Sequence, residues 1–152
     1  MYTILLVEDN RETARLMRFL FELEGYRVVA ADAYEDILPL LQQIRPNALL
    51  MDVNVHGRET VSLVRQVRTL VGKAAETLIF MTSAMDCASE CLGAGADRFI
   101  LKPFLPDEVV RDVKLLCRLK YIRPDYIGET VAVGSEYDTG AGLGWSSSKR
   151  NA

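Results

Sequence analysis

The chain has 152 residues, of which 49% are hydrophobic and 26% are charged. This length fits one domain with a single core, and the composition is that of a globular protein rather than a disordered one. With 18 basic against 21 acidic residues, the net charge of −3 gives no electrostatic case for nucleic-acid binding. No apolar run approaches the roughly 20 residues that span a bilayer, so we expect no membrane partner either.

The cysteines and the N-terminus bear on the cellular compartment. Cys87, Cys91 and Cys117 match neither a disulfide framework nor a zinc spacing. Cys87 and Cys91 could share one face of a helix, where we interpret them as small, semi-buried residues. The N-terminus enters a strand-like segment directly and shows no secretory signal. A reducing compartment fits best, and we expect a cytoplasmic location.

Short β-rich runs alternate along the chain with segments whose apolar residues recur at helical spacing. The first helix is the clearest, because its apolar stripe from Ala14 to Leu23 is followed by Gly25 as a stop signal. Pro39 falls inside the second, which predicts a kink or a later start of the regular helix. Strands are expected at 2–7, 26–30, 47–52, 77–81 and 98–101, and helices at 14–23, 33–44, 59–70, 86–92 and 106–120.

Five strands alternating with five helices predict an α/β fold in which helices cover both faces of a parallel sheet. The run over residues 48–51 has no polar alternation, so we expect that strand to be central. Residues 122–152 have no helical period, and we interpret them as a Gly/Ser-rich tail or linker without a separate domain. The alternative is a partner-docking segment anchored by Tyr137 or Trp145. No DNA-reading unit is visible there.

Four of the expected strands end in polar residues, and in an open parallel sheet that edge is where ligands bind. Three carboxylates, one hydroxyl and one ammonium group should therefore converge. They belong to Glu8 and Asp9 after the first strand, Asp52 at the end of the third, Thr82 after the fourth and Lys102 after the fifth.

This set of groups predicts a site for a divalent metal and a phosphoryl group. Glu8, Asp9 and Asp52 can supply the oxygen ligands that Mg²⁺ prefers, and Mn²⁺ is possible there too. A cation among them relieves the mutual repulsion of the carboxylates. A carboxylate can also act as a nucleophile and become an acyl phosphate. Lys102 can then neutralise the phosphoryl oxygens, and the Thr82 hydroxyl can donate to one of them.

Each of these residues also has a purely structural interpretation. Asp9 or Asn10 could cap the first helix, and Asp52 could be an ordinary turn residue. Thr82 could be another cap, and Lys102 could be a solvated side chain. Their joint occurrence, in order, at four strand ends of one α/β domain favours the functional interpretation.

Four longer motifs contain these residues: Ile4-Leu5-Leu6-Val7-Glu8-Asp9-Asn10, Leu49-Leu50-Met51-Asp52-Val53-Asn54, Phe80-Met81-Thr82-Ser83-Ala84 and Gly95-Ala96-Asp97-Arg98-Phe99-Ile100-Leu101-Lys102-Pro103-Phe104. Together they resemble the receiver domains of two-component response regulators, and in particular the single-domain regulators of chemotaxis. The resemblance covers about residues 2–120, and we place the domain at 1–121. It implies a flavodoxin-like, doubly wound sheet with strand order 2-1-3-4-5.

The resemblance also implies a role for each site residue. Asp52 would be the phosphoacceptor, with a histidine kinase or a phosphotransfer protein as donor. Asp9 would ligate magnesium directly, Glu8 would hold it through water, and the backbone carbonyl of Asn54 would be a further ligand. Lys102 would pair first with the acidic cluster and then with the phosphoryl group.

A change of shape on phosphorylation is implied as well. The Thr82 hydroxyl would move toward the phosphate, and the ring of Phe99 would rotate inward. The face built by the fourth helix, the fifth strand and the fifth helix would then change for an unknown output protein. The family's Lys-Pro bond is typically cis, which we expect at Lys102-Pro103.

The chain departs from the family after Asp52, where a proline and then a glycine are usual. The segment His56-Gly57-Arg58-Glu59-Thr60 has neither in the expected place, which leaves the shape of this loop open. His56 could be a phosphohistidine or a base near Asp52, but we interpret it as a surface-loop residue. Phe99 replaces the common tyrosine and keeps the aromatic ring.

The leading hypothesis is a signalling module of two-component signal transduction, with weak self-directed phosphoryl chemistry and no ordinary enzymatic turnover. One alternative is a pseudo-receiver that binds partners without phosphorylation. The other is a phosphatase with an aspartate nucleophile, as in haloacid-dehalogenase-like enzymes. Those enzymes place a second aspartate two residues after the nucleophile, where this chain has Asn54.

Overall fold

The computed structural model describes residues 1–121. The unit discussed below is Met1–Val113, and the last helix continues from it to Tyr121. The expectations for residues 122–152 lie outside the described part of the chain. Among residues 1–121, no helix combines the length and the apolar character needed to cross a membrane.

The elements alternate in the predicted way. The strands of the main sheet are β1 (Thr3–Val7), β2 (Arg27–Ala30), β3 (Ala48–Asp52), β6 (Leu78–Ser83) and β7 (Arg98–Leu101). The helices are α1 (Arg11–Leu23), α2 (Tyr34–Ile44), α3 (Val61–Arg68), the 3-10 turn η1 (Gly72–Glu76), α4 (Ala88–Ala94) and α5 (Pro106–Tyr121). A separate two-stranded sheet is formed by β4 (Asn54–Val55) and β5 (Arg58–Glu59).

The main sheet is parallel and has the order β2-β1-β3-β6-β7, which confirms the predicted order 2-1-3-4-5. Strand β3 lies in the middle, with Leu49 paired to Leu5 of β1 and to Ile79 of β6. All three side chains are fully buried, which is why β3 shows no polar alternation. The central position expected for this strand is therefore confirmed.

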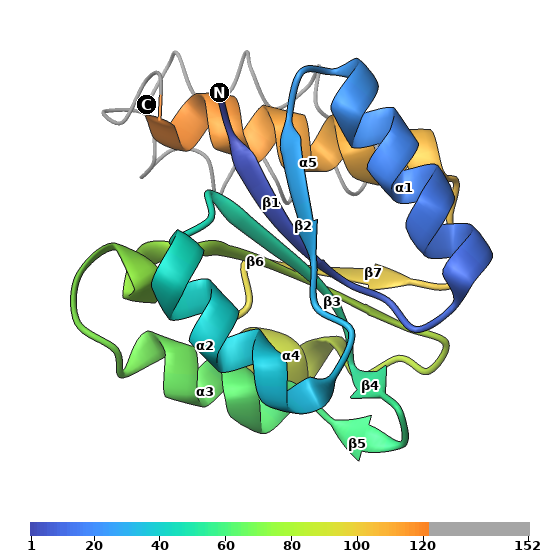
Figure 1. Ribbon diagram of the computed structural model, residues 1–152. Helices are drawn as coiled ribbons and strands as arrows, with labels where there is room; N and C mark the ends of the chain where they lie inside the picture. Colours follow the sequence, from blue (N-terminus) through green and yellow to red (C-terminus); the bar gives the residue numbers. More distant parts are fainter. Residues whose placement is uncertain (122–152) are drawn as a thin grey trace, which may run out of the picture. The chain divides into compact units, whose positions relative to one another are not determined.

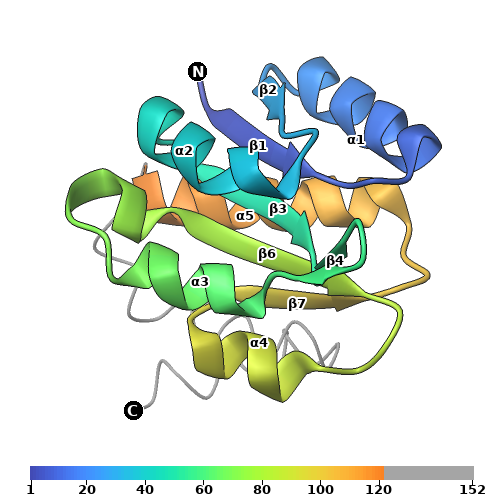
Figure 2. The ribbon, with the colours of Figure 1, turned by 60° about the horizontal axis from the view of Figure 1, so that its bottom comes forward.

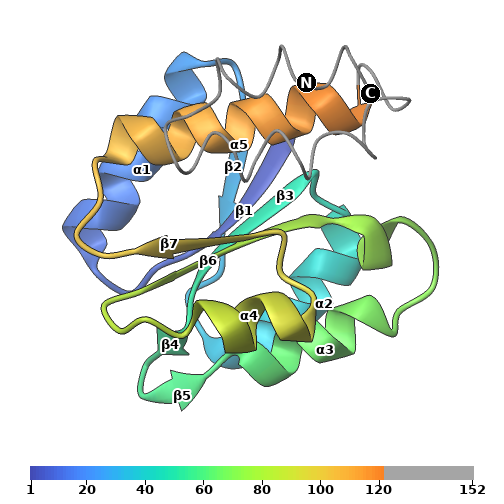
Figure 3. The same ribbon diagram turned by 180° about the vertical axis from the view of Figure 1, so that it is seen from behind.

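Helices cover both faces of the sheet (Figures 1 and 3). Helices α2, α3 and α4 lie on one face, and α1 and residues 106–113 of α5 lie on the other. On the first face, Leu5 and Leu49 belong to a buried cluster with Ile37 of α2, Val64 of α3 and Cys91 of α4. Successive residues of β1, β3 and β6 are buried on both faces of the sheet, which limits the register of these three strands.

A side-chain cap precedes α1, whereas α2 and α4 begin without one. Asn10 is the N-cap of α1, because its side-chain oxygen accepts a hydrogen bond from the Thr13 amide at 2.9 Å. Helix α2 begins at Tyr34, before Pro39, so a start of the helix at the proline is wrong. Proline inside the helix removes the hydrogen bond to the carbonyl four residues earlier, yet packing of Ile37 and Leu41 holds the segment helical.

The segment after Asp52 differs from the prediction, since the expected helix over 59–70 begins only at Val61 and a hairpin precedes it. His56 and Gly57 form the turn between β4 and β5, with φ angles of 51° and 78°. Positive φ at both central residues is typical of the two-residue hairpin turn that matches strand twist. Glu59 therefore lies in β5, and its carboxylate caps α3 by accepting the Ser62 amide hydrogen bond at 2.7 Å.

Arg68 joins the end of α3 to three other segments. Its guanidinium donates to the backbone carbonyls of Gly95, Ala75 and Thr77 at 2.8–2.9 Å. It also pairs with the Asp97 carboxylate at 2.9 Å. These bonds hold the side chain across the α4–β7 connection, where Gly95 ends α4 with a φ of +119°.

A substitution at this connection tests the arrangement. A Cβ at Gly95 would lie 2.7 Å from Cγ of Arg68 and would also impose a left-handed backbone on a non-glycine residue. We expect Gly95→Ala to lower the free energy of unfolding by about 2 kcal/mol or more, measured by urea denaturation. Gly93→Ala is the matched control, since nothing lies within 4 Å of its added Cβ. That variant should be neutral or more stable by up to about 1 kcal/mol, and equal losses at both sites would contradict this account.

Candidate functional site

Three carboxylates gather at the carboxyl edge of the sheet. Glu8 and Asp9 follow β1, and Asp52 ends the neighbouring β3. One oxygen from each of the three lies within 4.8 Å of the others. The register of β1 on β3 pairs Val7 with Met51, so the residues that follow meet at this edge. The predicted convergence of the three carboxylates is confirmed.

Lys102 places its ammonium group between two of these carboxylates. Its Nζ donates to Asp52 Oδ2 at 2.5 Å and to Glu8 Oε1 at 3.1 Å. The side chains of Glu8 and Asp52 are only 7% and 13% exposed, so these charge pairs are largely shielded from water. The Lys102 amide donates to the Ser83 carbonyl at 2.7 Å, and the peptide bond to Pro103 is cis, as expected.

The charge state of Lys102 follows from two opposing effects. Burial is the largest single influence and disfavours the ammonium form. Hydrogen bonds to Asp52 and Glu8, together with their negative charges, outweigh it and raise the pKa of Lys102 above its ordinary value of 10.5. The side chain is therefore a fixed cation at neutral pH.

Each carboxylate of the cluster also accepts a hydrogen bond from a backbone amide. Glu8 Oε2 accepts from Asn10 at 3.2 Å, and Asp52 Oδ1 accepts from Asn54 at 3.0 Å. Asp9 Oδ2 accepts from the amide of His56 at 3.2 Å. Amide donors stabilise the ionised carboxylates and fix their orientation, so the site has defined oxygen positions.

Of the remaining predicted residues, Thr82 and Asn54 adjoin the cluster, whereas Phe99 lies on the next strand. Thr82 is 3% exposed and is paired in the sheet with Asp52, so it is adjacent to the carboxylates. Asn54 is the first residue of β4, two residues after Asp52 at the end of β3 (Figure 2). Phe99 is instead half-buried against the core and is paired with Met81 on β7. No hydrogen bond joins it to the cluster.

Thr60 has a part in this site that the sequence did not reveal. It is fully buried, and its hydroxyl donates to the backbone carbonyls of Asp52 at 2.8 Å and of Val53 at 3.0 Å. It thereby fastens the end of β3 to the start of α3. The expected helix over 59–70 would have placed Thr60 in its first turn, and no motif marks it as a partner of Asp52.

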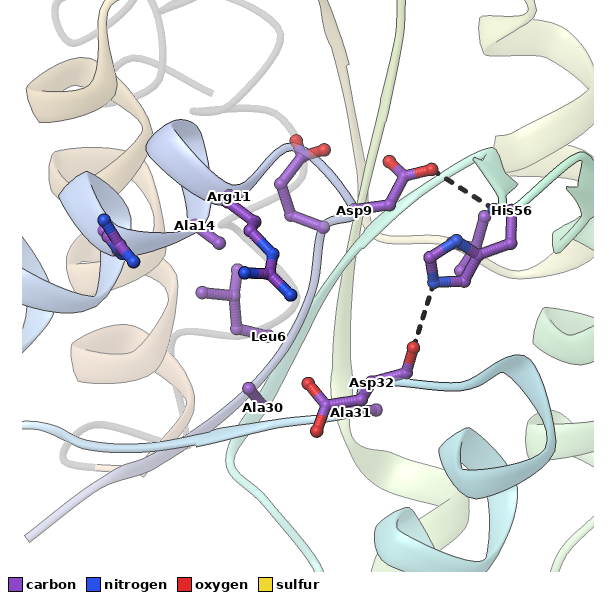
Figure 4. Close-up of a pocket in the computed structure, with 11 residues that line it drawn as sticks. Leu6, Asp9, Arg11, Ala14, Ala30, Ala31, Asp32 and His56 are labelled. Atoms are coloured by element: carbon purple, nitrogen blue, oxygen red, sulfur yellow. Dashed lines mark hydrogen bonds between the residues drawn. The ribbon is translucent and has the colours of Figure 1, made fainter.

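A cavity of about 440 Å³ adjoins the acidic cluster on the side of β2 and α1. Arg11 and Arg15 of α1 and the residues Asp32 and His56 line it, along with Glu8 and Asp9 (Figure 4). His56 is exposed on the turn of the β4–β5 hairpin, and its Nε2 lies 2.9 Å from the carbonyl oxygen of Asp32. The predicted exposure of this histidine at the surface is confirmed.

The donor set fits a hard divalent cation. Glu8, Asp9 and Asp52 offer only oxygen ligands, and cysteine and histidine side chains contribute none to the cluster. Mg²⁺ prefers such oxygen sites, commonly with one or two carboxylates and with water completing the shell. The cluster can therefore hold magnesium next to Lys102.

Comparison with known proteins identifies the family. Residues 4–114 match the model of the response regulator receiver domain. The chain is also 35% identical over 118 residues to the aerobic respiration control protein ArcA of Escherichia coli K12. That match covers 76% of this chain and 48% of ArcA, so the chain spans about half the length of this relative.

Solved structures agree with this result. The receiver domain of the sensor histidine kinase PA1611 of Pseudomonas aeruginosa, with a magnesium ion coordinated in its active site cleft, is 26% identical, with a TM-score of 0.67. That match covers 76% of this chain and 97% of the other. The receiver domain of Francisella response regulator 1452 shares the fold at 23% identity and a TM-score of 0.70, covering 78% and 98% of the two chains. The chain thus belongs to the response regulator receiver domains, a family of phosphoacceptor signalling modules rather than turnover enzymes.

Proposed function

We propose that Asp52 is the phosphoacceptor of this receiver domain. The observation that carries the proposal is the contact of Lys102 with both Asp52 and Glu8 beside the third carboxylate of Asp9. Asp52 is the member of the cluster that ends a central strand, and one of its oxygens faces the ammonium group. The phosphoryl group would thus arrive next to a fixed cation.

The donor would be a phosphohistidine of a histidine kinase or of a phosphotransfer protein. An oxygen of Asp52 forms the new P–O bond while the P–N bond of the phosphohistidine breaks. The imidazole leaves with the electron pair and takes up a proton. Lys102, already paired with Asp52, then follows the negative charge onto the phosphoryl oxygens.

The metal ligands would be Glu8 through water, Asp9, Asp52 and the backbone carbonyl of Asn54. When bound, Mg²⁺ supplies positive charge to the phosphoryl oxygens, and Mn²⁺ can replace it. The magnesium ion in the cleft of the PA1611 receiver domain supports this assignment. The hydrogen bond from the His56 amide to Asp9 Oδ2 supports it further, since it orients the side chain of Asp9 and leaves its Oδ1 to face a cation.

Phosphorylation would be transmitted by Thr82 and Phe99 to the face made by α4, β7 and residues 106–113 of α5. Thr82 lies beside Asp52, and Phe99 lies on the next strand, half-buried where a ring can change its rotamer. Large apolar side chains are exposed on α4 and β7 and near them: Met85, Leu92, Leu101 and Leu105. We propose a protein as the output partner there, and neither nucleic acid nor a membrane. A cytoplasmic location stays a prediction.

The two alternative functions are less well supported. Retention of the whole set of three carboxylates, Thr82 and Lys102 argues against a pseudo-receiver. A phosphatase of the haloacid-dehalogenase type needs a carboxylic acid two residues after its nucleophile. That position holds Asn54, whose side-chain oxygen already accepts the Gly57 amide at 3.0 Å.

The phosphoacceptor assignment is tested with a small-molecule acyl phosphate and Mg²⁺. We expect a single adduct, stable in acid and labile in base, that appears in intact-mass spectra of the wild type and is absent from Asp52→Asn. Asp36→Asn, an exposed carboxylate in the first turn of α2, is the control and should retain the adduct. An adduct of equal yield in Asp52→Asn would contradict the assignment.

The Lys102 contacts predict a dependence of stability on alkaline pH. Because the folded-state pKa lies above 10.5, the contribution of the ammonium is fully present below that value and is lost as the pH rises through the folded pKa. The difference in unfolding free energy between wild type and Lys102→Met should stay constant from neutral pH to about 10 and shrink above it. Urea denaturation across this range measures it. A difference that grows with pH would contradict the ion pairs.

A further inference from the structure

The β4–β5 hairpin lies between the acidic cluster and the start of α2, and it contacts both. On the cluster side, the His56 amide donates to Asp9 Oδ2 at 3.2 Å. On the other side, the His56 ring lies 2.9 Å from the carbonyl oxygen of Asp32, in the segment between β2 and α2 (Figure 4). The turn of the hairpin therefore joins a proposed metal ligand to a segment with no part in the chemistry.

A second contact fixes the hairpin one residue beyond its turn. The guanidinium of Arg58 lies over the ring of Tyr34, 3.7 Å from the ring centroid, and its Nη1 pairs with Glu35 Oε1. Tyr34 is half-buried against the core, so its ring is a fixed platform for the cation. Arg58 and Glu35 are 51% and 71% exposed, and an ion pair of this exposure contributes little alone. The cation–π contact with the Tyr34 ring adds a preferred orientation of the Arg58 guanidinium, which the exposed ion pair alone does not impose.

The hairpin also carries a proposed ligand of its own. Asn54 lies on β4, and its partner in the two-stranded ladder is Glu59. Its amide donates to Asp52, and its side-chain oxygen accepts from Gly57 across the turn. Any displacement of the hairpin would therefore move the carbonyl of Asn54 and the hydrogen bond to Asp9 together.

We propose that Tyr34, Arg58 and Glu35 form a clamp that positions the β4–β5 hairpin for metal binding. The clamp rests on the proposed function, in which Asn54 and Asp9 are ligands of Mg²⁺. A two-stranded hairpin is marginally stable in water by itself, and this one is also held by buried Val55 and by the contacts of His56. Without the clamp, more of its ordering would have to accompany binding of the ion. With the clamp, that ordering has already taken place in the free protein, and the affinity for the metal is higher. These three residues are positioning residues and do not touch the ion.

The direction in which substitutions change the metal affinity distinguishes the clamp from a simple electrostatic effect of Arg58. Arg58 is a cation near an acidic site, so removal of its charge alone would strengthen the binding of a divalent cation. Loss of the clamp would weaken binding. Replacement of Tyr34 leaves every arginine and carboxylate in place, so a change in the metal affinity of that variant reports loss of the clamp without this opposing electrostatic contribution.

The test measures the dissociation constant of Mn²⁺ by electron paramagnetic resonance of the free ion. We expect Arg58→Met and Tyr34→Leu to bind Mn²⁺ about three- to tenfold more weakly than wild type, in line with the modest energies of exposed ion pairs and cation–π contacts. Tyr34→Phe keeps the ring and should bind as wild type does. Arg111→Met, which breaks an exposed ion pair with Asp107 within α5, is the matched control and should leave the constant unchanged.

Two further readouts distinguish positioning from general damage. The His56 amide should exchange its hydrogen faster in Arg58→Met and Tyr34→Leu than in wild type. The free energy of unfolding of Arg58→Met should fall only by the small amount expected for the loss of one exposed cation–π contact and one exposed ion pair. Unchanged or tighter binding of Mn²⁺ by Arg58→Met together with unchanged binding by Tyr34→Leu would overturn the clamp. Failure of wild-type protein to bind Mn²⁺, or equal binding by Asp9→Asn, would instead overturn the proposed metal site and the clamp with it.

Discussion

Repulsion among three carboxylates at one edge of the sheet is the constraint on which the rest of this structure depends. Glu8, Asp9 and Asp52 keep one oxygen each within 4.8 Å of the others, an arrangement that is costly without compensating positive groups. Lys102 provides one full charge, and three backbone amides provide partial charges. The negative charge that these groups leave uncompensated gives the cluster an affinity for a divalent cation. It also lets the cluster accommodate the charge changes of phosphoryl transfer.

The parallel sheet makes this arrangement possible because it brings distant parts of the chain to one edge. Burial of β1, β3 and β6 on both faces leaves little freedom of register, so polar residues at their ends meet predictably. This is why strand periodicity and the points at which the apolar runs stop were sufficient to predict that Asp9 and Asp52 lie at one edge of the sheet. The strand order, in contrast, was predicted from the resemblance to receiver domains, and the pairing of the five strands agrees with it.

The hairpin after Asp52 could not be predicted in the same way. His56-Gly57 is a less familiar turn pair than Asn-Gly, and its two flanking strands have two residues each, too few for a visible alternation. The contacts of Thr60 with β3 and of Arg58 with Tyr34 join residues that no periodic pattern relates. Such contacts depend on side-chain packing across the fold, which a one-dimensional pattern does not encode.

Lys102 and the proposed divalent metal would balance the same negative charge on Asp52 and Glu8. The most direct test is the dissociation constant of Mn²⁺ for wild type and for Lys102→Met at neutral pH and low ionic strength. Since the ammonium competes with the ion for Asp52 and Glu8, the variant should bind Mn²⁺ more tightly, by about threefold or more. Unchanged or weaker binding by Lys102→Met would contradict the account.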